Sequence, residues 1–340
     1  MAGVEADAEY QRVLAAEVAV TIWREVASVR KSISIVVPAY NEEACVDELA
    51  RQLTAVFDKA SAYDFEVIVV ENGSTDRTLE RLLAIREHDE RFRIIELARN
   101  YRPEGGVTAG LAHATGDAVI LMCADLQDPP ELIHDFIEKW EEGYDHVYGV
   151  VTRRRGTSLI RRMNARAFYW IAGKMSGNII PKDAALFRLA DRRVYEAVNA
   201  MPERRRLLRA LFAWVGFRSI AIKYERPPRF GGQSNSVTLY AIDIAMTGIA
   251  SYSKIPLRAI GVLGLLISSL GALSLVVVGA VAAFGGSPAV WSALAAGAGL
   301  MFGLVFVCLG IMAEYLGMVY DEVKDRPTFV VRRRIGFDAA

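Results

Sequence analysis

The sequence predicts an α/β fold in which helices cover both faces of a mostly parallel sheet, followed by a helical hairpin that crosses a membrane. From residue 32 to residue 150, short apolar runs alternate with segments of helical periodicity, which is the pattern of parallel strands joined by helical crossovers. From residue 255 to residue 318 the chain is almost free of charged side chains. These two observations predict one α/β domain followed by a membrane anchor.

Composition narrows the class of protein. The 340 residues include 40 basic and 40 acidic residues, and this balance argues against a general nucleic-acid binder. Hydrophobic residues make up 53% of the chain, a high share for a soluble protein, which indicates membrane segments. The three cysteines lie far apart without metal-ligand spacing, so we expect no disulfide framework and a reducing compartment.

Residues 1–31 are predicted to form an amphipathic helix. Glu17 interrupts their apolar stretch, so a secretory signal peptide is not expected. The apolar residues that can share one helical face are Tyr10, Val13, Leu14, Ile22 and Trp23. Such a helix docks either on the α/β domain or on the membrane surface.

Residues 32–236 are predicted to form the α/β domain. Strands are expected at residues 33–37, 65–70, 93–97, 119–122 and 146–150. Helices are expected after residue 41, at 76–88, up to residue 114 and at 130–142. Asn41 is expected to cap the first helix, because its side chain can accept backbone hydrogen bonds and Glu42 and Glu43 follow at once.

The apolar run 119–122 ends in side chains that carry oxygen, namely Asp125, Gln127 and Asp128. In open α/β sheets, ligands bind outside the carboxyl ends of the strands. Carboxylate and amide oxygens also suit a divalent metal. We therefore expect Asp125 and Gln127 at a site for a metal-bound phosphate. The alternative is an ordinary polar turn after a strand.

Residues 151–235 are strongly basic and less regular. Their arginine runs lie at 153–155, 161–162 and 204–206. Such runs either form a solvated face or contact phosphates and lipid headgroups, since the guanidinium fork matches phosphate oxygens. We expect Arg161 and Arg162 to hold a lipid phosphate near the headgroup plane.

The membrane signal lies near the end of the chain. Between Arg258 and Glu314 there is no Asp, Glu, Lys or Arg, and residues 285–288 break this run into two pieces. Each piece has about 25 residues, enough to span a hydrocarbon core of ~30 Å. Basic residues flank both outer ends, so both termini and the α/β domain are predicted to lie in the cytoplasm. The alternative is a buried hairpin of a soluble protein.

These features divide the second half of the chain into three further segments. Residues 237–254 are predicted to form an interfacial amphipathic helix that brings the domain to the bilayer. Residues 255–318 hold the two transmembrane helices, and residues 319–340 form a basic cytoplasmic tail. The chain is therefore expected to be an integral protein of the cytoplasmic membrane.

Several motifs in residues 32–334 resemble those of the family-2 polyprenyl-phosphate glycosyltransferases, which include dolichol-phosphate mannose synthase and the bactoprenol glucosyltransferases. The motifs occur in the order and at the spacing of the family. They are Ile35-Val36-Val37-Pro38-Ala39-Tyr40-Asn41-Glu42-Glu43, the Gly73-Ser74-Thr75-Asp76 turn, Ala124-Asp125-Leu126-Gln127-Asp128-Pro129-Pro130, Phe187-Arg188, Met201-Pro202-Glu203-Arg204 and Glu314-Tyr315-Leu316-Gly317. The resemblance implies a GT-A fold, a nucleotide-sugar donor and a polyprenyl phosphate acceptor. It also implies a divalent metal, Mg²⁺ or Mn²⁺, transfer with inversion, and a homo-oligomer, often a tetramer.

The resemblance also implies roles for individual residues. Contacts with the nucleotide sugar are implied for Pro38, Tyr40, Glu42, Val70, Asn72, Cys123, Ala124, Asp125 and Arg229. Metal-ligand positions fall on Asp125 and Gln127, with Cys123 at the position of a third ligand. Asp125 and Arg229 are the residues to which the resemblance gives catalytic roles.

The chain also departs from the family pattern. Cys123 replaces the first Asp of the Asp-x-Asp metal motif, and Asn72 and Leu186 stand where the family usually has acids. A thiol is a poor ligand for Mg²⁺, so Cys123 is expected to be at most an auxiliary ligand, or else a small buried residue. An acceptor phosphate with a second pKa near ~6 is already mostly a dianion, so the loss of an acid at Leu186 is tolerable.

Three classes of function therefore remain open. The first is a membrane glycosyltransferase that uses a polyprenyl phosphate acceptor. The second is a relative without activity that acts as a partner or regulatory subunit. The third is a membrane-anchored module that senses a nucleotide.

Overall fold

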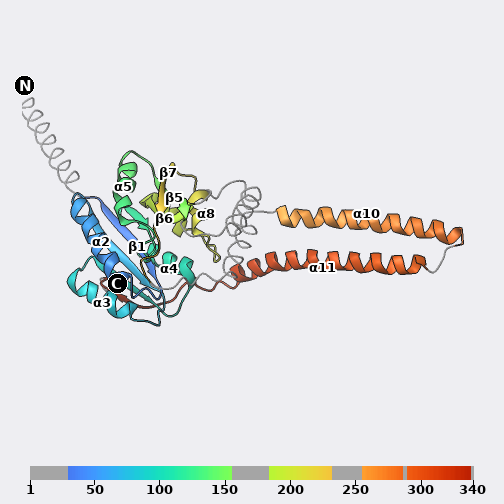
Figure 1. Cartoon of the computed structure of the whole chain (residues 1–340), viewed down its shortest axis with the longest axis horizontal. Coiled ribbons are helices and arrows are strands. Elements are labelled where there is room, and N and C mark those ends of the chain that lie inside the picture. Colours follow the sequence, from blue (N-terminus) through green and yellow to red (C-terminus); the bar gives the residue numbers. More distant parts are fainter. Residues whose placement is uncertain (1–29, 155–183, 232–254, 286–288, 338–340) are drawn as a thin grey trace, which may run out of the picture.

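The computed structural model describes residues 30–154, 184–231, 255–285 and 289–337. It shows one α/β domain from which two long helices extend side by side (Figure 1). Most of the predicted amino-terminal helix, Arg161, Arg162 and the predicted interfacial helix at 237–254 lie outside these residues.

The domain is built on an eight-stranded sheet with the order β7-β5-β6-β4-β1-β2-β3-β8. Its strands are β1 (Ser32–Ala39), β2 (Asp64–Glu71), β3 (Phe92–Leu97), β4 (Ala118–Leu121), β5 (His146–Arg154), β6 (Ala184–Asp191), β7 (Ser219–Arg226) and β8 (Val331–Ile335). β1 is parallel to β2 and β4, β2 is parallel to β3, and β5 is parallel to β7. β6 runs antiparallel to β4 and β5, and β8 runs antiparallel to β3. The sheet is therefore mixed but mostly parallel.

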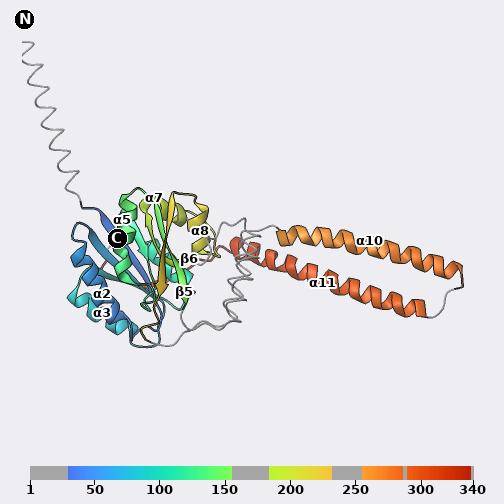
Figure 2. The same cartoon turned by 45° about the horizontal axis from the view of Figure 1, so that its top comes forward.

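Helices cover both faces of this sheet (Figure 2). On one face lie α2 (Val46–Lys59), α3 (Thr78–His88) and α5 (Ile133–Glu141), the last preceded by the short turn η1 (Pro130–Leu132). On the other face lie α4 (Arg102–Leu111), α7 (Arg192–Asn199) and α8 (Leu208–Trp214). Each face has its own apolar core cluster, as expected for a sheet buried on both sides. This arrangement confirms the predicted α/β fold, a mostly parallel sheet with helices on both faces.

Residue spacing explains how the first helices pack. α2 buries Val46, Leu49 and Leu53, whose spacing of three and four places them in one stripe along the helix. α4 approaches β1 so closely that a Cβ atom on Gly110 would lie 2.2 Å from Val36 Cγ1. A glycine is therefore required where this helix crosses the strand.

The predicted cap of the first helix is wrong. α2 begins at Val46, and its cap position makes no side-chain hydrogen bond. Asn41 instead adopts a φ of 54°, and its Oδ1 accepts a hydrogen bond of 2.8 Å from the Thr75 N–H. The chain turns sharply between β1 and α2, and asparagine tolerates the left-handed conformation that this turn requires. Asn41 thus joins two loops at the edge of the sheet.

The two long helices are α10 (Ile255–Ala283) and α11 (Ala289–Val323). Each contains a segment long and apolar enough to cross a membrane, Ala259–Val281 in α10 and Gly297–Val323 in α11. Large apolar side chains on both are exposed, Leu266 and Phe302 among them, and a lipid phase would cover such surfaces. α11 continues past residue 318, the predicted end of the second span.

The segment after α11 returns to the domain. β8 pairs with the edge strand β3, and the Ala98 N–H donates a 2.9 Å hydrogen bond to Val330 O. Arg332 and Arg333 form ion pairs of 3.2 and 3.0 Å with Glu96. Part of the predicted basic tail is therefore a strand of the sheet.

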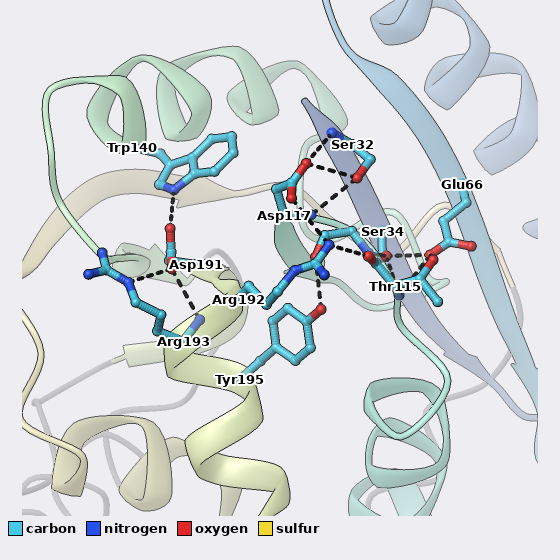
Figure 3. A network of polar contacts seen from close by, with 11 residues as sticks. Ser32, Ser34, Glu66, Thr115, Asp117, Trp140, Asp191, Arg192, Arg193 and Tyr195 are labelled. Atoms are coloured by element: carbon cyan, nitrogen blue, oxygen red, sulfur yellow. Dashed lines mark hydrogen bonds and ion pairs between the residues drawn. The ribbon is translucent and has the colours of Figure 1, made fainter. Parts of the chain in front are cut away.

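A polar network fixes the amino ends of β1 and β4, at the edge opposite to the loops described below (Figure 3). Asp117 accepts hydrogen bonds from the Ser32 N–H at 2.9 Å and the Ser32 hydroxyl at 3.0 Å. The Tyr195 hydroxyl donates to Gly116 O at 2.8 Å, which ties α7 to the same turn. These contacts hold the start of β4 against β1.

Candidate active site

The candidate site lies where the carboxyl ends of β1, β2 and β4 meet. In the register of the sheet, Pro38 lies beside Val70 and Val36 lies beside Leu121. The loops that follow these three strands therefore start side by side. This is the edge at which open α/β sheets bind their ligands.

The loop after β4 turns so that its acidic residues point in different directions. Leu126 has a φ of 57°, and Asp125 Oδ1 accepts a 3.1 Å hydrogen bond from the Gln127 N–H. Asp128 is fully buried and its Oδ2 accepts a 3.2 Å hydrogen bond from the Cys123 N–H. Asp125 and Gln127 remain partly exposed. The turn thus leaves Asp125 and Gln127 accessible to a ligand, whereas the buried Asp128 fixes the conformation of the turn.

Asp128 connects this turn to β7. Its Oδ1 accepts a 2.7 Å hydrogen bond from the Tyr224 hydroxyl and a 3.1 Å bond from Arg226 Nη2. A buried carboxylate is tolerated only when it is paired and hydrogen-bonded, and Asp128 meets both conditions. The sequence pattern indicates no such role for Asp128, because Tyr224 and Arg226 lie 96 and 98 residues further along the chain.

Arg229 brings two predicted site residues together. Its Nη2 donates to both Glu42 carboxylate oxygens, at 2.5 and 2.6 Å, and its Nη1 lies 3.8 Å from Asp125 Oδ2. Its Nε donates to Gly231 O at 2.6 Å, which fixes the guanidinium. Residues from the loops after β1, β4 and β7 therefore meet around one cation.

Burial shapes the charges at this point. It raises the pKa of Glu42 above its usual value, although the charge of Arg229 opposes the rise. Burial likewise raises the pKa of Asp125, against the opposing effect of the Gln127 N–H. It raises the pKa of the Cys123 thiol well above its usual value, and the negative charges of Asp128 and Asp125 add to that rise. Cys123 is therefore a neutral thiol at neutral pH.

The oxygen donors fit a divalent metal that takes its other ligands from elsewhere. Asp125 Oδ2 lies 3.8 Å from the Arg229 guanidinium, and the Gln127 side chain is half-buried beside it. In the described part of the chain, no three His, Cys, Asp or Glu side chains gather in a metal-binding group. Mg²⁺ often keeps one or two protein oxygens and completes its shell with phosphates and water. Asp125 and Gln127 match that mode, whereas the neutral Cys123 thiol does not.

The other residues predicted to contact the nucleotide sugar are divided between surface and interior. Pro38 and Tyr40 keep part of their surface exposed at the edge of the sheet, whereas Val70 and Ala124 are buried. Asn72 is also buried, and both the nitrogen and the oxygen of its side-chain amide are hydrogen-bonded. Its Nδ2 donates to Arg102 O and its Oδ1 accepts from the Tyr101 N–H, both at 2.9 Å. Asn72 thus holds the start of α4 through backbone groups of Tyr101 and Arg102.

Of the three arginine runs, only 204–206 lies entirely within the described residues. In the run 204–206, Arg205 pairs with Asp321 at 2.8 Å, and the Arg204 N–H donates to Glu322 at 2.9 Å. The Arg204 guanidinium also contacts Asp325. These arginines join the domain to the end of α11, so they are not free to hold phosphate in this state.

Comparison with known proteins agrees with this geometry. Residues 34–208 match the model of glycosyl transferase family 2. An uncharacterized glycosyltransferase of Bacillus subtilis, YkcC, is 38% identical over 90% of this chain and 94% of its own length. An uncharacterized glycosyltransferase of Synechocystis is 39% identical over 88% and 94%. A prophage bactoprenol glucosyl transferase homolog of Escherichia coli K12 is 31% identical over 88% and 98%. The chain therefore belongs to glycosyl transferase family 2 and is a glycosyltransferase.

Proposed function

We propose that this protein transfers a sugar from a nucleotide-sugar donor to a polyprenyl phosphate. The observation that supports this most is the meeting of Arg229, Glu42 and Asp125 at the ligand-binding edge of the sheet, in a chain with two helices long enough to span a membrane. Relatives that match nearly the full chain are named bactoprenol glucosyl transferases. A bactoprenol-type acceptor is consistent with a membrane-anchored enzyme.

The donor is proposed to bind along the edge formed by the first three loops. Pro38 and Tyr40 border the base and ribose, and the diphosphate lies beside Asp125, Gln127 and Arg229. To reach a phosphate, Arg229 exchanges one or both of its bonds with Glu42. Because both partners are anions, the guanidinium keeps its charge paired throughout the exchange.

In the transfer, an oxygen of the acceptor phosphate forms a bond to the anomeric carbon while the bond from that carbon to the diphosphate oxygen breaks. Attack from the side opposite to the diphosphate inverts the anomeric centre. The phosphate is already mostly a dianion at neutral pH, so no general base is needed, consistent with Leu186 at the family's acidic position. Arg229 stabilises the charge that develops on the departing diphosphate. A divalent metal, when bound by Asp125 and Gln127, supplies additional positive charge to that diphosphate.

We also propose that α10 and α11 span the cytoplasmic membrane with the domain and both termini in the cytoplasm. The basic flanks of the hairpin support this orientation. Protease protection in oriented vesicles tests the orientation. The homo-oligomeric state stays a prediction. Cleavage of the segment after Val323 only from the outer side would contradict the orientation.

The function is tested by radiolabel transfer from a panel of nucleotide sugars to undecaprenyl phosphate, with Mg²⁺, with Mn²⁺ and with chelator. Formation of a lipid-linked sugar from at least one donor is the expected result. Cys123 at a metal-ligand position favours a second candidate, a partner or regulatory subunit without activity. Absence of product from every donor, with intact nucleotide binding, would overturn the first proposal and favour the second.

A further inference from the structure

α11 extends further toward the α/β domain than α10 does (Figures 1 and 2). The two helices pack so that a Cβ atom on Gly271 of α10 would lie 3.2 Å from Met301 Cε of α11. Arg258 and Glu314, the charged residues that bound the apolar run, each lie thirteen residues from this contact in the direction of the domain. Antiparallel helices with the same rise therefore place them at about the same level. Beyond that level α11 continues for nine residues to Val323, or roughly 14 Å at 1.5 Å per residue.

This last part of α11 does not need to lie in the hydrocarbon core. The uncharged part of the helix, residues 289–313, is longer than the ~20 residues that cross a core of ~30 Å. Glu314, Asp321 and Glu322 follow it, and acidic side chains are costly within a membrane. The end of α11 is therefore expected to project from the bilayer into water.

Arg205 of the α/β domain binds two of these acidic residues. It lies between α7 and α8, its Nη2 is 2.8 Å from Asp321 Oδ2, and its Nη1 is 3.5 Å from Glu314 Oε1. Glu314 and Asp321 are seven residues apart, so they lie on one face of α11 about two turns from each other. The Arg204 N–H donates a 2.9 Å hydrogen bond to Glu322 Oε1. The segment before α8 thus holds the last turns of the helix.

The chain after α11 makes a second, separate connection to the domain. Thr328 O lies 3.3 Å from the position that a Cβ atom on Gly105 of α4 would occupy. Phe329 packs, partly buried, against the apolar core cluster on the α4 side of the sheet. β8 then pairs with β3. α11 is therefore joined to the domain both through its acidic side chains and through the strand that follows it, and the two connections restrict rotation of the domain about the end of the helix.

The proposed reaction makes the position of the domain relative to the bilayer important. The phosphate of a polyprenyl phosphate stays at the headgroup plane, because its apolar chain stays in the lipid. A nucleotide sugar approaches from water and reaches a cleft at any height above the membrane. The height of the cleft therefore matters for the acceptor and not for the donor.

We propose that Arg205 is a positioning residue, which together with Arg204 clamps the water-exposed end of α11 and fixes the height of the candidate active site above the membrane. This inference rests on the proposed function and adds how the same site reaches its lipid acceptor. Misplacing reacting groups by about 1 Å lowers a rate by up to about a hundredfold, so small movements of the domain are enough to affect transfer. Because partly exposed ion pairs contribute little to stability, the contact acts through position rather than through folding of the domain.

The first experiment locates the end of α11. Tyr320 and Phe306 have 59% and 71% of their surface exposed, and each is replaced by Cys in protein embedded in vesicles. A water-soluble maleimide reacts with a thiolate in water, so Tyr320→Cys should react at least about tenfold faster than Phe306→Cys. The wild type, whose Cys45 and Cys308 are buried, serves as the blank. Equal protection of both positions would place the end of α11 in lipid and overturn the inference.

The second experiment measures the contact between Arg205 and α11 without turnover. Spin labels at Leu309→Cys on α11 and Glu138→Cys on α5, both exposed positions, report the distance between the anchor and the domain. The distance distribution should broaden in Arg205→Glu and narrow again in the double variant Arg205→Glu with Asp321→Arg. Arg51→Glu, which breaks an exposed ion pair within α2, is the matched control and should leave the distribution unchanged. An unchanged distribution in Arg205→Glu would overturn the inference.

The third experiment compares sugar transfer to undecaprenyl phosphate in vesicles and in detergent micelles. In vesicles, Arg205→Glu should lower kcat/KM for the acceptor by about fivefold to twentyfold, and the double variant should recover most of this loss. In micelles, where the acceptor is not confined to a plane, Arg205→Glu should stay close to the wild-type value. KM for the donor should be unchanged in both media. Melting temperatures show that each variant is folded under the conditions of the assay.

Equal losses in vesicles and in micelles would show a general defect of Arg205→Glu and overturn the positioning role. Failure of the proposed function looks different, because the wild type would then transfer no sugar in either medium. The spin-label distances would still decide whether Arg205 holds the end of α11.

Discussion

Arg229 and Glu42 form a two-bond ion pair, in which one guanidinium nitrogen donates to both carboxylate oxygens at 2.5 and 2.6 Å. Both side chains are mostly buried, with 22% and 12% of their surface exposed. Because this pair is shielded from water, it fixes the Arg229 guanidinium beside Asp125. In the proposed mechanism, an incoming diphosphate replaces Glu42 as the partner of Arg229, so changes at Arg229 should strongly affect the site.

Replacing Arg229 by Ala should lower turnover by roughly 10²- to 10³-fold, the scale for loss of one preorganised electrostatic group. The turnover of Arg229→Lys should lie between that of the wild type and that of Arg229→Ala. The lysine ammonium group keeps the positive charge, but it cannot form the paired hydrogen bonds of a guanidinium group. Initial rates at saturating donor and acceptor measure the effect. Arg51→Ala, which breaks an exposed pair with Glu48, serves as the control and should keep the wild-type rate. An active Arg229→Ala enzyme would contradict this role.

The second prediction separates Asp125 from Cys123. Asp125→Ala should abolish the increase in nucleotide affinity that Mg²⁺ brings, because it removes the carboxylate that we propose as a metal ligand. Cys123→Ala should have little effect, since the thiol is neutral and poorly suited to Mg²⁺. Cys123→Asp should tighten Mg²⁺ binding by adding a hard oxygen ligand. Calorimetry with and without chelator gives the four affinities. If all four proteins bind the nucleotide equally and without metal, the metal assignment is wrong.

The third prediction concerns the anchor under the site. Tyr224→Phe removes a 2.7 Å hydrogen bond to the buried Asp128 and should lower the free energy of unfolding by about 1–3 kcal/mol, the cost of an unsatisfied buried group. Tyr63→Phe is the control, because its hydroxyl contacts the exposed Glu141. It should change stability by less than about 0.5 kcal/mol. Urea unfolding of the full chain in detergent measures both, and equal effects would argue against Asp128 as an anchor.

The fourth prediction is that the Asp117 carboxylate makes the stability of the protein depend on pH. Asp117 lies at the amino ends of β1 and β4, away from the candidate active site (Figure 3). The Ser32 N–H, assisted by the Ser32 hydroxyl and Arg192, lowers the pKa of Asp117 below its usual value of 3.8. A carboxyl with a lowered folded pKa stabilises the protein above its unfolded pKa, and this contribution is lost as the pH falls through the folded value. The wild type should therefore exceed Asp117→Asn in melting temperature at pH 6. This difference in melting temperature should shrink below about pH 4. A difference that stays constant over this range would refute the stabilising role of the Asp117 carboxylate.

The fifth prediction tests the contact between the domain and α11. Arg205→Glu should lower the melting temperature by placing like charges together at Asp321. The double variant Arg205→Glu with Asp321→Arg should recover most of that loss. The recovery is expected to correspond to roughly 0.2–1 kcal/mol, because the pair is partly exposed. Purely additive effects in this double-mutant cycle would show that the pair does not couple the two parts.

Local patterns predicted the fold well because the strands and helices are marked by short-range periodicity. Val46, Leu49 and Leu53 show the helical period, and the strands of the sheet centre are continuous apolar runs. The meeting of Asp125 and Arg229 was implied by the resemblance to known glycosyltransferases. Their separation of more than a hundred residues leaves no local trace from which physics alone could find the pair.

What the sequence did not reveal depends on contacts between distant segments. β8 is a short, arginine-rich stretch whose partner Glu96 lies more than two hundred residues earlier, so it looks like a charged tail. Asn72 matches a ligand position, yet its amide is used by the backbone of Tyr101 and Arg102. Asn41 has the chemistry of a cap, and tertiary contacts with Thr75 determined its conformation instead.

The pairing of β8 with β3 also sets an order of events during synthesis. β8 is translated after both long helices, so the edge of β3 stays unpaired while α10 and α11 leave the ribosome. A nascent chain that stops before residue 331 would have every residue of the cleft and still expose a strand edge able to pair with other chains. Completion of the eight-stranded sheet thus requires residues that are translated after both long helices.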